Sequence, residues 1–210
     1  MVRVVVCDFD GVVVDSNRLK HEMFFRLFPA EEGPVVERVL AEAREETRVE
    51  IIRRILSAAG GRVDPEQVAA LAAAYDREVT ASIRAIGPRP GVRETLAGLA
   101  RRYEVSLNST TPEVSLRRTV ADLGLEGLFR QVRGAPASKP DNLASIMAAA
   151  EAAGDEVVVI GDGESDLTSA RAHGCRFVGI PNEFNRWDGA GFPVIADLTA
   201  LPDLLSRLRP

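Results

Sequence analysis

The chain has 210 residues, of which 46% are hydrophobic and 27% charged, and its formal net charge is −5. This is the composition of a folded globular protein long enough for one core domain that carries a smaller insertion. No apolar run approaches the roughly 20 residues of a membrane span, and the first residues do not resemble a secretion signal. Acidic and basic residues are interspersed without a basic block, so we expect no nucleic acid or membrane partner and a cytoplasmic location.

The first predicted strand, Val2 to Cys7, is an apolar run that ends at two acids. Asp8 and Asp10 follow it, separated by Phe9, and Gly11 allows a sharp turn directly after them. In open parallel α/β sheets ligands bind at the carboxyl ends of the strands, so paired carboxylates at this point indicate a reactive site. Asp and Gly are also ordinary turn residues, and taken alone the pair fits a surface turn equally well.

The segment from Val14 to Ile86 contains helical patterns and no convincing strand. Its predicted helices are Leu19 to Leu27, Pro34 to Leu56 and Pro65 to Ile83. The chain then passes through Gly87-Pro88-Arg89-Pro90-Gly91, where two prolines stiffen the backbone. We therefore predict a helical domain at residues 14–86, inserted into a core formed by residues 1–13 and 87–210.

After about residue 90, short Val-rich runs alternate with helical patterns. The predicted strands are Glu104 to Ser109, Gln131 to Gly134, Glu156 to Gly161, Arg176 to Ile180, and Val194 to Ile195. The predicted helices are Val92 to Arg102, Pro112 to Leu123, Asp141 to Ala153, and Ser165 to His173. Such alternation predicts an α/β fold in which a Rossmann-like parallel sheet carries helices on both faces.

Three further polar segments follow strands or open helices in this part of the chain. They are Asn108-Ser109-Thr110-Thr111, the loop around Lys139, and the segment from Gly161 to Asp166. A hydroxyl beside a helix start can donate to an anion, a lysine can neutralise a phosphate or a nucleophilic carboxylate, and carboxylates suit Mg²⁺. A helix cap, a solvated lysine and a Gly-Asp-Gly turn are the ordinary alternatives. Together with Asp8 and Asp10, however, these groups form the set that metal-assisted phosphoryl transfer needs.

In their order, spacing and strand context, these residues resemble the four motifs of the haloacid dehalogenase superfamily. Asp8-Phe9-Asp10-Gly11-Val12 is similar to the first motif, Ser109 to the second, Lys139 to the third, and the segment from Gly161 to Asp166 to the fourth. The insertion falls where the phosphoglycolate phosphatase and β-phosphoglucomutase-like members carry a helical cap. The resemblance implies a Rossmann-like core with an inserted all-helical cap domain, and a phosphatase that acts on a small phosphorylated metabolite.

The resemblance also implies a role for each acid. Asp8 is the nucleophile that forms an aspartyl-phosphate, and Asp10 is the general acid and base. Mg²⁺ is held by the side chain of Asp8, the backbone carbonyl of Asp10, and Asp162. Asp166 supports the metal through water or orients the lysine of the third motif, and Glu164 is a further candidate at this site.

Ser109 and Lys139 are implied to bind the transferring phosphoryl group. In the family, Asn commonly follows the Ser or Thr of the second motif, whereas here Asn108 precedes Ser109. Thr110 is therefore an alternative hydroxyl donor. We keep Ser109 because it aligns best with the end of the predicted strand.

Related activities remain open at this point. A sugar phosphomutase shares Asp8 and Asp10 but carries a His at the position where this chain has Lys20. A phosphonate hydrolase forms a Schiff base on a cap lysine, and Lys20 is the only lysine of the insertion. A dehalogenase lacks the second acid, so Asp10 argues against that activity. Nothing in the sequence supports a catalytically idle binding protein.

Substrate selection is expected to lie in the insertion, with Lys20 and Arg48 as substrate-binding residues. Arg44 and Arg48 are one helical turn apart and would bind a second anionic group of the substrate. Alternatively, they form ion pairs with the interleaved glutamates of the same stretch. The segment from Asn182 to Asn185 is predicted to rim the active-site edge. A monomer or homodimer with a small-molecule substrate is expected.

Overall fold

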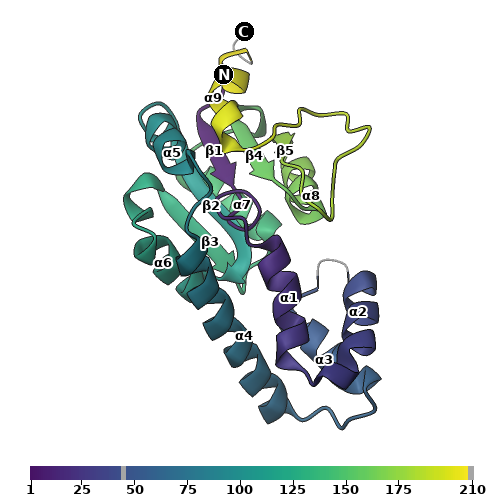
Figure 1. Cartoon of the computed structure of the whole chain (residues 1–210). Coiled ribbons are helices and arrows are strands. Elements are labelled where there is room, and N and C mark those ends of the chain that lie inside the picture. The colour runs from purple at the N-terminus through teal and green to yellow at the C-terminus, as the bar shows by residue number, and fades with distance from the viewer. Residues whose placement is uncertain (44–45, 208–210) are drawn as a thin grey trace. The chain divides into compact units, whose positions relative to one another are not determined.

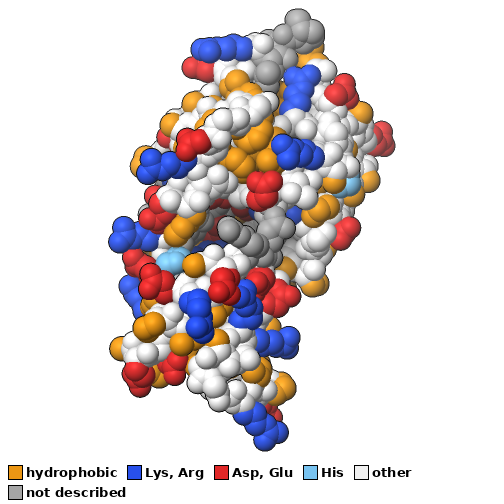
Figure 2. Space-filling view, turned by 90° about the vertical axis from the view of Figure 1, so that its right-hand side faces the viewer, with side chains coloured by type: hydrophobic (Ala, Val, Ile, Leu, Met, Phe, Trp, Pro, Cys, Tyr) orange, Lys and Arg blue, Asp and Glu red, His pale blue; other side chains and the backbone are white. Residues whose placement is uncertain are grey.

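The computed structural model describes residues 1–43 and 46–207 (Figure 1). The chain forms two compact units, of which the larger contains Met1–Asp15 and Ile86–Pro210 and the smaller contains Ser16–Ala85. No helix in the described part of the chain is long and apolar enough to cross a membrane. Acidic and basic side chains are intermixed over the face shown in Figure 2, as the interspersed charges of the sequence predict.

The larger unit is built on a parallel sheet with the strand order β3-β2-β1-β4-β5. The strands are β1 (Val4–Cys7), β2 (Glu104–Pro112), β3 (Gln131–Ala135), β4 (Val157–Gly161) and β5 (Arg176–Gly179). All residues of β1 and β4 are buried, as expected for strands covered on both faces. The predicted strand Val194 to Ile195 is wrong, because Val194 forms only an isolated bridge to Gly179.

Helices connect these strands and cover the sheet. They are α5 (Val92–Ala100), α6 (Glu113–Asp122), α7 (Lys139–Ala149), α8 (Glu164–Ala172) and α9 (Leu201–Arg207). Val4 and Val6 of β1 pack in one buried cluster with Leu143 and Ile146 of α7 and with Leu167 of α8. This architecture confirms the predicted α/β class, and it fixes the strand ends that carry the polar motifs.

The smaller unit is helical, with α1 (Asn17–Leu27), α2 (Gly33–Glu42), α3 (Arg48–Ala58) and α4 (Pro65–Ile86). One predicted helix, Pro34 to Leu56, is wrong because α2 and α3 are separate helices. Thr47 starts the second of them with a capping box, in which its side chain accepts from the Glu50 amide and Glu50 bonds back to the Thr47 backbone. A cap of this kind begins a new helix and outweighs the continuous apolar periodicity.

Gly154 allows a close approach of two backbone segments before β4. A Cβ at this position would meet the carbonyl oxygen of His173 and lie 2.8 Å from that of Gly174. We expect Gly154→Ala to lower the free energy of unfolding by about 1–3 kcal/mol, the usual cost of overpacking. Gly127→Ala is the matched control, since Gly127 also lies in a short 3₁₀ segment but has nothing within 4 Å of an added Cβ.

Urea unfolding of both variants and of the parent chain measures this difference, because a shift in midpoint with an unchanged slope reports stability alone. Equal stability of Gly154→Ala and Gly127→Ala would contradict the close approach. A loss in both variants would point instead to a general intolerance of alanine in these short segments.

Candidate active site

The polar motifs meet at the carboxyl edge of the sheet. Asp8 follows β1 and Asp162 follows β4, and these strands pair in register with Cys7 opposite Ile160. On the other side of β1, Cys7 lies opposite Leu107, so that Ser109 follows along β2 toward the same edge. Three neighbouring strands therefore deliver two carboxylates and a hydroxyl to one place, as the sequence predicts for an open parallel sheet.

The Asp8 carboxylate is buried and held at both oxygens. Its Oδ2 accepts from Nζ of Lys139 at 2.8 Å, and its Oδ1 accepts from the backbone amide of Phe9 at 2.6 Å. Its backbone amide donates to the carbonyl of Ile160 at 2.9 Å, which ties Asp8 to β4. The side chain is thus fixed by a cation and an amide, and the alternative of a simple surface turn is wrong.

Lys139 is the first residue of α7, and its ammonium group bridges two acids. Besides Asp8, Nζ donates to Oδ1 of Asp166 at 2.7 Å. The Lys139 residue is only 5% exposed, so the alternative of a solvated lysine is wrong. Its backbone is also fixed, because its carbonyl accepts from Nδ2 of Asn108 at 2.8 Å and Ser138 caps the helix. A buried lysine needs such partners, since an unpaired charge in the interior is strongly unfavourable.

Burial and the charge of Lys139 or of its acidic partners shift the pKa values of Asp8, Lys139 and Asp166 in opposite directions. Burial tends to lower the pKa of Lys139, but the charges of Asp166 and Asp8 raise it above its ordinary value and keep the ammonium protonated. Burial raises the pKa of Asp8 and of Asp166, and the nearby Lys139 offsets only part of that effect. Two carboxylates and one ammonium therefore leave a buried surplus of negative charge.

A divalent cation fits this surplus. Carboxylate oxygens of Asp8, Asp162 and Asp166 all lie within 4.8 Å of one another, and all three residues are buried. Three carboxylates against the single charge of Lys139 leave a formal excess of negative charge, and the buried Asp10 carboxylate beside Asp8 adds to it. Carboxylate oxygens are also the hard ligands that Mg²⁺ prefers. The residues present thus suit Mg²⁺ in donor type and in charge.

Asp162 has a polar support that comes from the loop after β5. Nδ2 of Asn182 donates to Oδ2 of Asp162 at 2.9 Å and to its carbonyl oxygen at 3.2 Å. Oδ1 of Asn182 accepts from the backbone amides of Phe184 and Asn185 at 2.7 Å each. The segment from Asn182 to Asn185 therefore contacts the acidic site itself, and the amide of Asn182 orients one oxygen of Asp162.

The three hydroxyl groups at the end of β2 differ in burial and in their hydrogen-bond partners. Ser109 is buried, and its Oγ accepts from the backbone amide of Thr111 at 3.1 Å. Thr110 is exposed. Thr111 was not singled out by the sequence reasoning, yet its Oγ1 donates to Oδ2 of Asp10 at 3.1 Å. These two residues are 101 positions apart, so no local sequence signal reports the contact.

Comparison with known proteins agrees with this arrangement of motifs. A family model described as a haloacid dehalogenase-like hydrolase matches residues 2–174. The chain belongs to the haloacid dehalogenase-like hydrolase family. The family predicted from the four motifs is thereby confirmed, and the protein is a hydrolase.

Individual relatives of this hydrolase match over nearly its whole length. A phosphoglycolate phosphatase of Cereibacter sphaeroides is 29% identical over 215 residues, covering 97% of this chain and 98% of the relative. A structure of a predicted phosphoglycolate phosphatase from Haemophilus somnus has a TM-score of 0.77 at 15% identity and covers 97% of this chain and 98% of its own. A mutant of CbbY from Rhodobacter sphaeroides in complex with xylulose-1,5-bisphosphate has a TM-score of 0.77 at 20% identity, covering 96% of each chain. The two structures establish the likeness in fold.

The predicted substrate-binding residues of the insertion form part of a polar cluster within the smaller unit. Nη2 of Arg48 pairs with Oδ2 of Asp76 at 2.8 Å, and the Tyr75 hydroxyl donates to the carbonyl of Lys20 at 3.2 Å. Burial raises the pKa of Asp76, while the charges of Arg48 and Lys20 oppose that rise. Lys20 and Arg48 therefore both act on one half-buried acid. Arg44 lies outside the described residues.

The sequence also allowed the arginines of this stretch to pair with nearby glutamates, and Arg54 forms such pairs. Arg54 bonds to Glu42 at 2.7 Å and to Glu46 at 2.5 Å. Arg48 has a partner in α4 instead, so it is not part of that surface arrangement.

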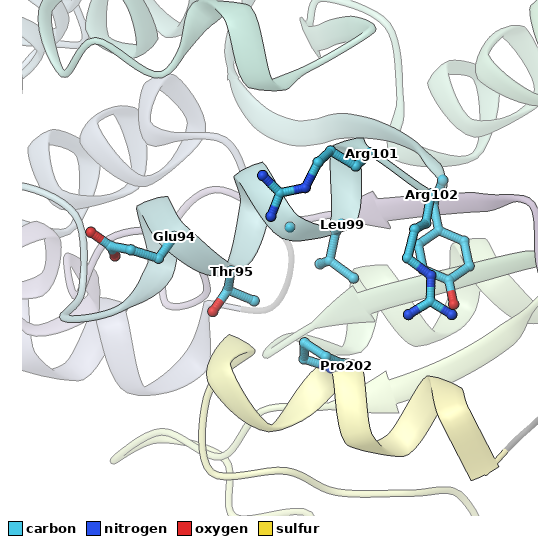
Figure 3. A pocket seen from close by; sticks show the side chains of 8 residues that line it. Glu94, Thr95, Leu99, Arg101, Arg102 and Pro202 are labelled. Carbon is cyan, nitrogen blue, oxygen red and sulfur yellow. The ribbon is translucent and has the colours of Figure 1, made fainter.

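A separate pocket of about 470 Å³ lies between α5 and α9 in the larger unit (Figure 3). Glu94, Leu99 and Pro202 line it together with Arg102, whose guanidinium lies 5.7 Å from the ring centroid of Tyr103. Tyr103 directly precedes β2, so this pocket belongs to the amino-terminal edge of the sheet. The acidic cluster lies at the opposite edge, and the pocket holds none of the predicted site residues.

Removing the cation between Asp8 and Asp166 should destabilise the fold. We expect Lys139→Met to lower the free energy of unfolding at neutral pH by about 3–5 kcal/mol, because it leaves buried carboxylates without their partner. Arg3→Met is the control, since Arg3 pairs with Glu156 at the surface and its loss should cost less than about 1 kcal/mol. Denaturant unfolding measures both values.

The deficit of Lys139→Met should shrink as the pH falls toward about 5. Buried carboxylates without the lysine have raised pKa values, so the folded state binds protons more tightly than the unfolded state and gains stability as the pH falls. A deficit that stays constant over this range would indicate lost packing and not lost charge compensation.

Proposed function

We propose that this hydrolase is a Mg²⁺-dependent phosphatase that removes the phosphoryl group of a small phosphorylated metabolite through an aspartyl-phosphate on Asp8. The observation that carries this proposal is the buried Asp8 carboxylate, bound at 2.8 Å by Lys139 and surrounded by the carboxylates of Asp162 and Asp166. The family membership and the relatives named phosphoglycolate phosphatase support the same activity.

In the first step, a carboxylate oxygen of Asp8 attacks phosphorus, and the bond from phosphorus to the leaving oxygen breaks. The Phe9 amide and the Lys139 ammonium hold the carboxylate at its two oxygens, so the attacking group is fixed before substrate arrives. Lys139 also offers positive charge to the phosphoryl oxygens. The burial of Ser109 supports it, over the exposed Thr110, as the hydroxyl that donates to the same group.

Asp10 moves the proton in both steps. It first gives a proton to the leaving oxygen, so that an alcohol departs. It then takes a proton from the water that attacks phosphorus, which breaks the bond to Asp8 and releases inorganic phosphate. The Asp8 carboxylate is regenerated, and Asp10 is again protonated for the next substrate.

Mg²⁺ would be held by the side chains of Asp8 and Asp162 and by the backbone carbonyl of Asp10, and when bound it supplies positive charge that offsets the charge of the phosphate oxygens. Asp166 is assigned to the orientation of Lys139, because its Oδ1 accepts from Nζ at 2.7 Å. Asn182 orients Asp162 by its hydrogen bond of 2.9 Å. The role of Glu164, the cytoplasmic location and the monomer or homodimer stay predictions from the sequence.

The natural substrate is proposed to carry a second anionic group besides the phosphate. Lys20 and Arg48 are the residues proposed to bind it, since both are cations of one polar cluster. Phosphoglycolate, in the names of the relatives, is a compound of this type because it has a carboxylate and a phosphate. A sugar phosphomutase would instead return an isomerised sugar phosphate, and a phosphonate hydrolase would cleave a carbon–phosphorus bond, so analysis of the products separates these alternatives.

Asp8→Asn should abolish turnover, because an amide oxygen is a poor nucleophile. With Mg²⁺ and a panel of phosphorylated metabolites together with 4-nitrophenyl phosphate, we expect phosphate release to fall by at least about 10³-fold relative to the parent chain. The parent chain should lose activity on removal of Mg²⁺ by EDTA and regain it when Mg²⁺ is added. Its acid-quenched form should carry phosphate that hydroxylamine releases, and the variant should not.

Retention of about a tenth of the activity in a folded Asp8→Asn protein would refute the assignment of the nucleophile. Circular dichroism and the melting temperature of the variant serve as the folding control. A parent chain that releases no phosphate from any of these compounds at any Mg²⁺ concentration would refute the phosphatase itself.

Arg48→Met should change selectivity more than catalysis. For a substrate with a carboxylate beside its phosphate, we expect KM to rise about 10-fold, the loss of one charge-assisted contact. For 4-nitrophenyl phosphate, which lacks a second anionic group, KM should stay within about 2-fold of the parent value. Arg54→Met is the matched control, because its partners are Glu42 and Glu46. An equal change of KM for both substrates would contradict this role of Arg48.

A further inference from the structure

We infer that Thr111 is a positioning residue for Asp10, whose carboxylate its hydroxyl orients for proton transfer. The inference rests on the proposed function, in which Asp10 is the general acid and base. The observation is the hydrogen bond from Oγ1 of Thr111 to Oδ2 of Asp10, with a length of 3.1 Å. Both residues belong to the larger unit.

The backbone of Asp10 is fixed by a tight turn. The amide of Gly11 donates to the carbonyl of Val14 at 2.8 Å, and the amides of Val13 and Val14 donate to the carbonyl of Phe9 at 2.9 and 3.1 Å. Gly11 has φ = 73°, a conformation that favours glycine. This turn fixes the backbone of Asp10 but not the torsion angles of its side chain. The hydrogen bond from the Thr111 hydroxyl is one contact that restricts those torsion angles.

Thr111 lies at the end of β2, where the pairing with β3 shifts in register between Asn108 and Pro112. Its amide donates to Oγ of Ser109 at 3.1 Å, and the next residue, Pro112, pairs with Ala135 of β3 after this shift. A Cβ on Gly134 would collide with the carbonyl oxygen of Thr111, so β3 packs directly against this backbone. A hydroxyl on such a support holds its partner with little loss of conformational entropy on binding.

Glu113, the first residue of α6, adds a second connection between this turn and β3. Oε2 of Glu113 accepts from the amide of Gly134 at 3.3 Å, and Arg117 bonds to Oε1 of Glu113 at 2.8 Å and to the carbonyl of Val132 at 2.7 Å. These contacts secure the turn from β2 into α6. The Thr111 backbone is therefore held by contacts with β3 and by the turn into α6.

The direction of the hydrogen bond assigns different roles to the two oxygens of Asp10. Oδ2 accepts from the threonine, and we assign to Oδ1 the transfer of the proton to the leaving group and later from water. A carboxylate that rotates freely presents this oxygen correctly only part of the time. Fixing the rotation raises the rate of the steps that need the proton and has no effect on steps that do not.

Kinetics of three variants test this role. Thr111→Val keeps the branched shape and removes the hydroxyl, Thr111→Ser keeps the hydroxyl, and Thr168→Val is the control at an exposed threonine of α8. Each is assayed on an alkyl phosphate, whose leaving oxygen must be protonated, and on 4-nitrophenyl phosphate, whose leaving group departs as the anion. The quantity compared is kcat/KM, which depends only on the steps up to departure of the leaving group.

We expect Thr111→Val to lower kcat/KM for the alkyl phosphate by about 10-fold or more, within the range that general acid catalysis contributes. For 4-nitrophenyl phosphate the change should stay within about 2-fold. Thr111→Ser should restore the alkyl phosphate reaction to within about 3-fold of the parent chain, and Thr168→Val should leave both reactions unchanged. With Asp10 already replaced by Asn, adding Thr111→Val should not alter the ratio of the two reactions.

Two results would overturn the inference while the phosphatase assignment stands. One is a Thr111→Val protein with parent kinetics on both esters. The other is an equal loss on both esters that Thr111→Ser does not rescue, which would mean that the threonine supports the fold alone. A parent chain without turnover of either ester would overturn the proposed function together with the inference, and this result is distinct from the other two.

Discussion

The carboxyl edge of the sheet depends on one buried cation. The ammonium of Lys139 lies 2.8 Å from Asp8 and 2.7 Å from Asp166, and it thereby connects residues that follow β1, begin α7 and lie in α8. Replacing a buried ion pair of this kind by apolar residues often costs a protein no stability. The arrangement is therefore better explained by what it does to Asp8, whose carboxylate it orients and whose anion it favours against the effect of burial, than by a contribution to folding.

The sheet supplies the rigid support that such a site needs. The strands β1 and β4 are fully buried, and Val4 and Val6 pack against α7 and α8, the helices that carry Lys139 and Asp166. Close packing transmits any displacement of these helices to the charged groups. Three carboxylates and one ammonium remain unbalanced in this dry environment, so a divalent cation would relieve an electrostatic cost that the fold itself creates.

The parts of this arrangement that sequence could predict are those encoded locally. Runs of valine followed by Asp8 and Asp162 identified β1, β4 and their functional ends, because side chains in parallel strands are buried on both faces. The division between α2 and α3 was missed although Thr47 and Glu50 form a readable capping box, since the apolar periodicity was followed across it. The pair of Thr111 and Asp10 joins residues 101 positions apart, and only the folded sheet brings them together. For Lys139, a contact with a nucleophilic carboxylate and one with Asp166 were both among the expectations from the sequence, and the tertiary structure shows that one ammonium group makes both.

The two acids of the first motif receive different partners, and this difference accounts for their different proposed roles. Asp8 accepts from an ammonium group, a charge-assisted bond that favours the carboxylate anion and therefore a nucleophile. Asp10 accepts a hydrogen bond from the neutral hydroxyl of Thr111, which orients one of its oxygens. The sequence places two equivalent carboxylates two residues apart, and the fold gives them different hydrogen-bond donors, Lys139 at the start of α7 for Asp8 and Thr111 at the end of β2 for Asp10.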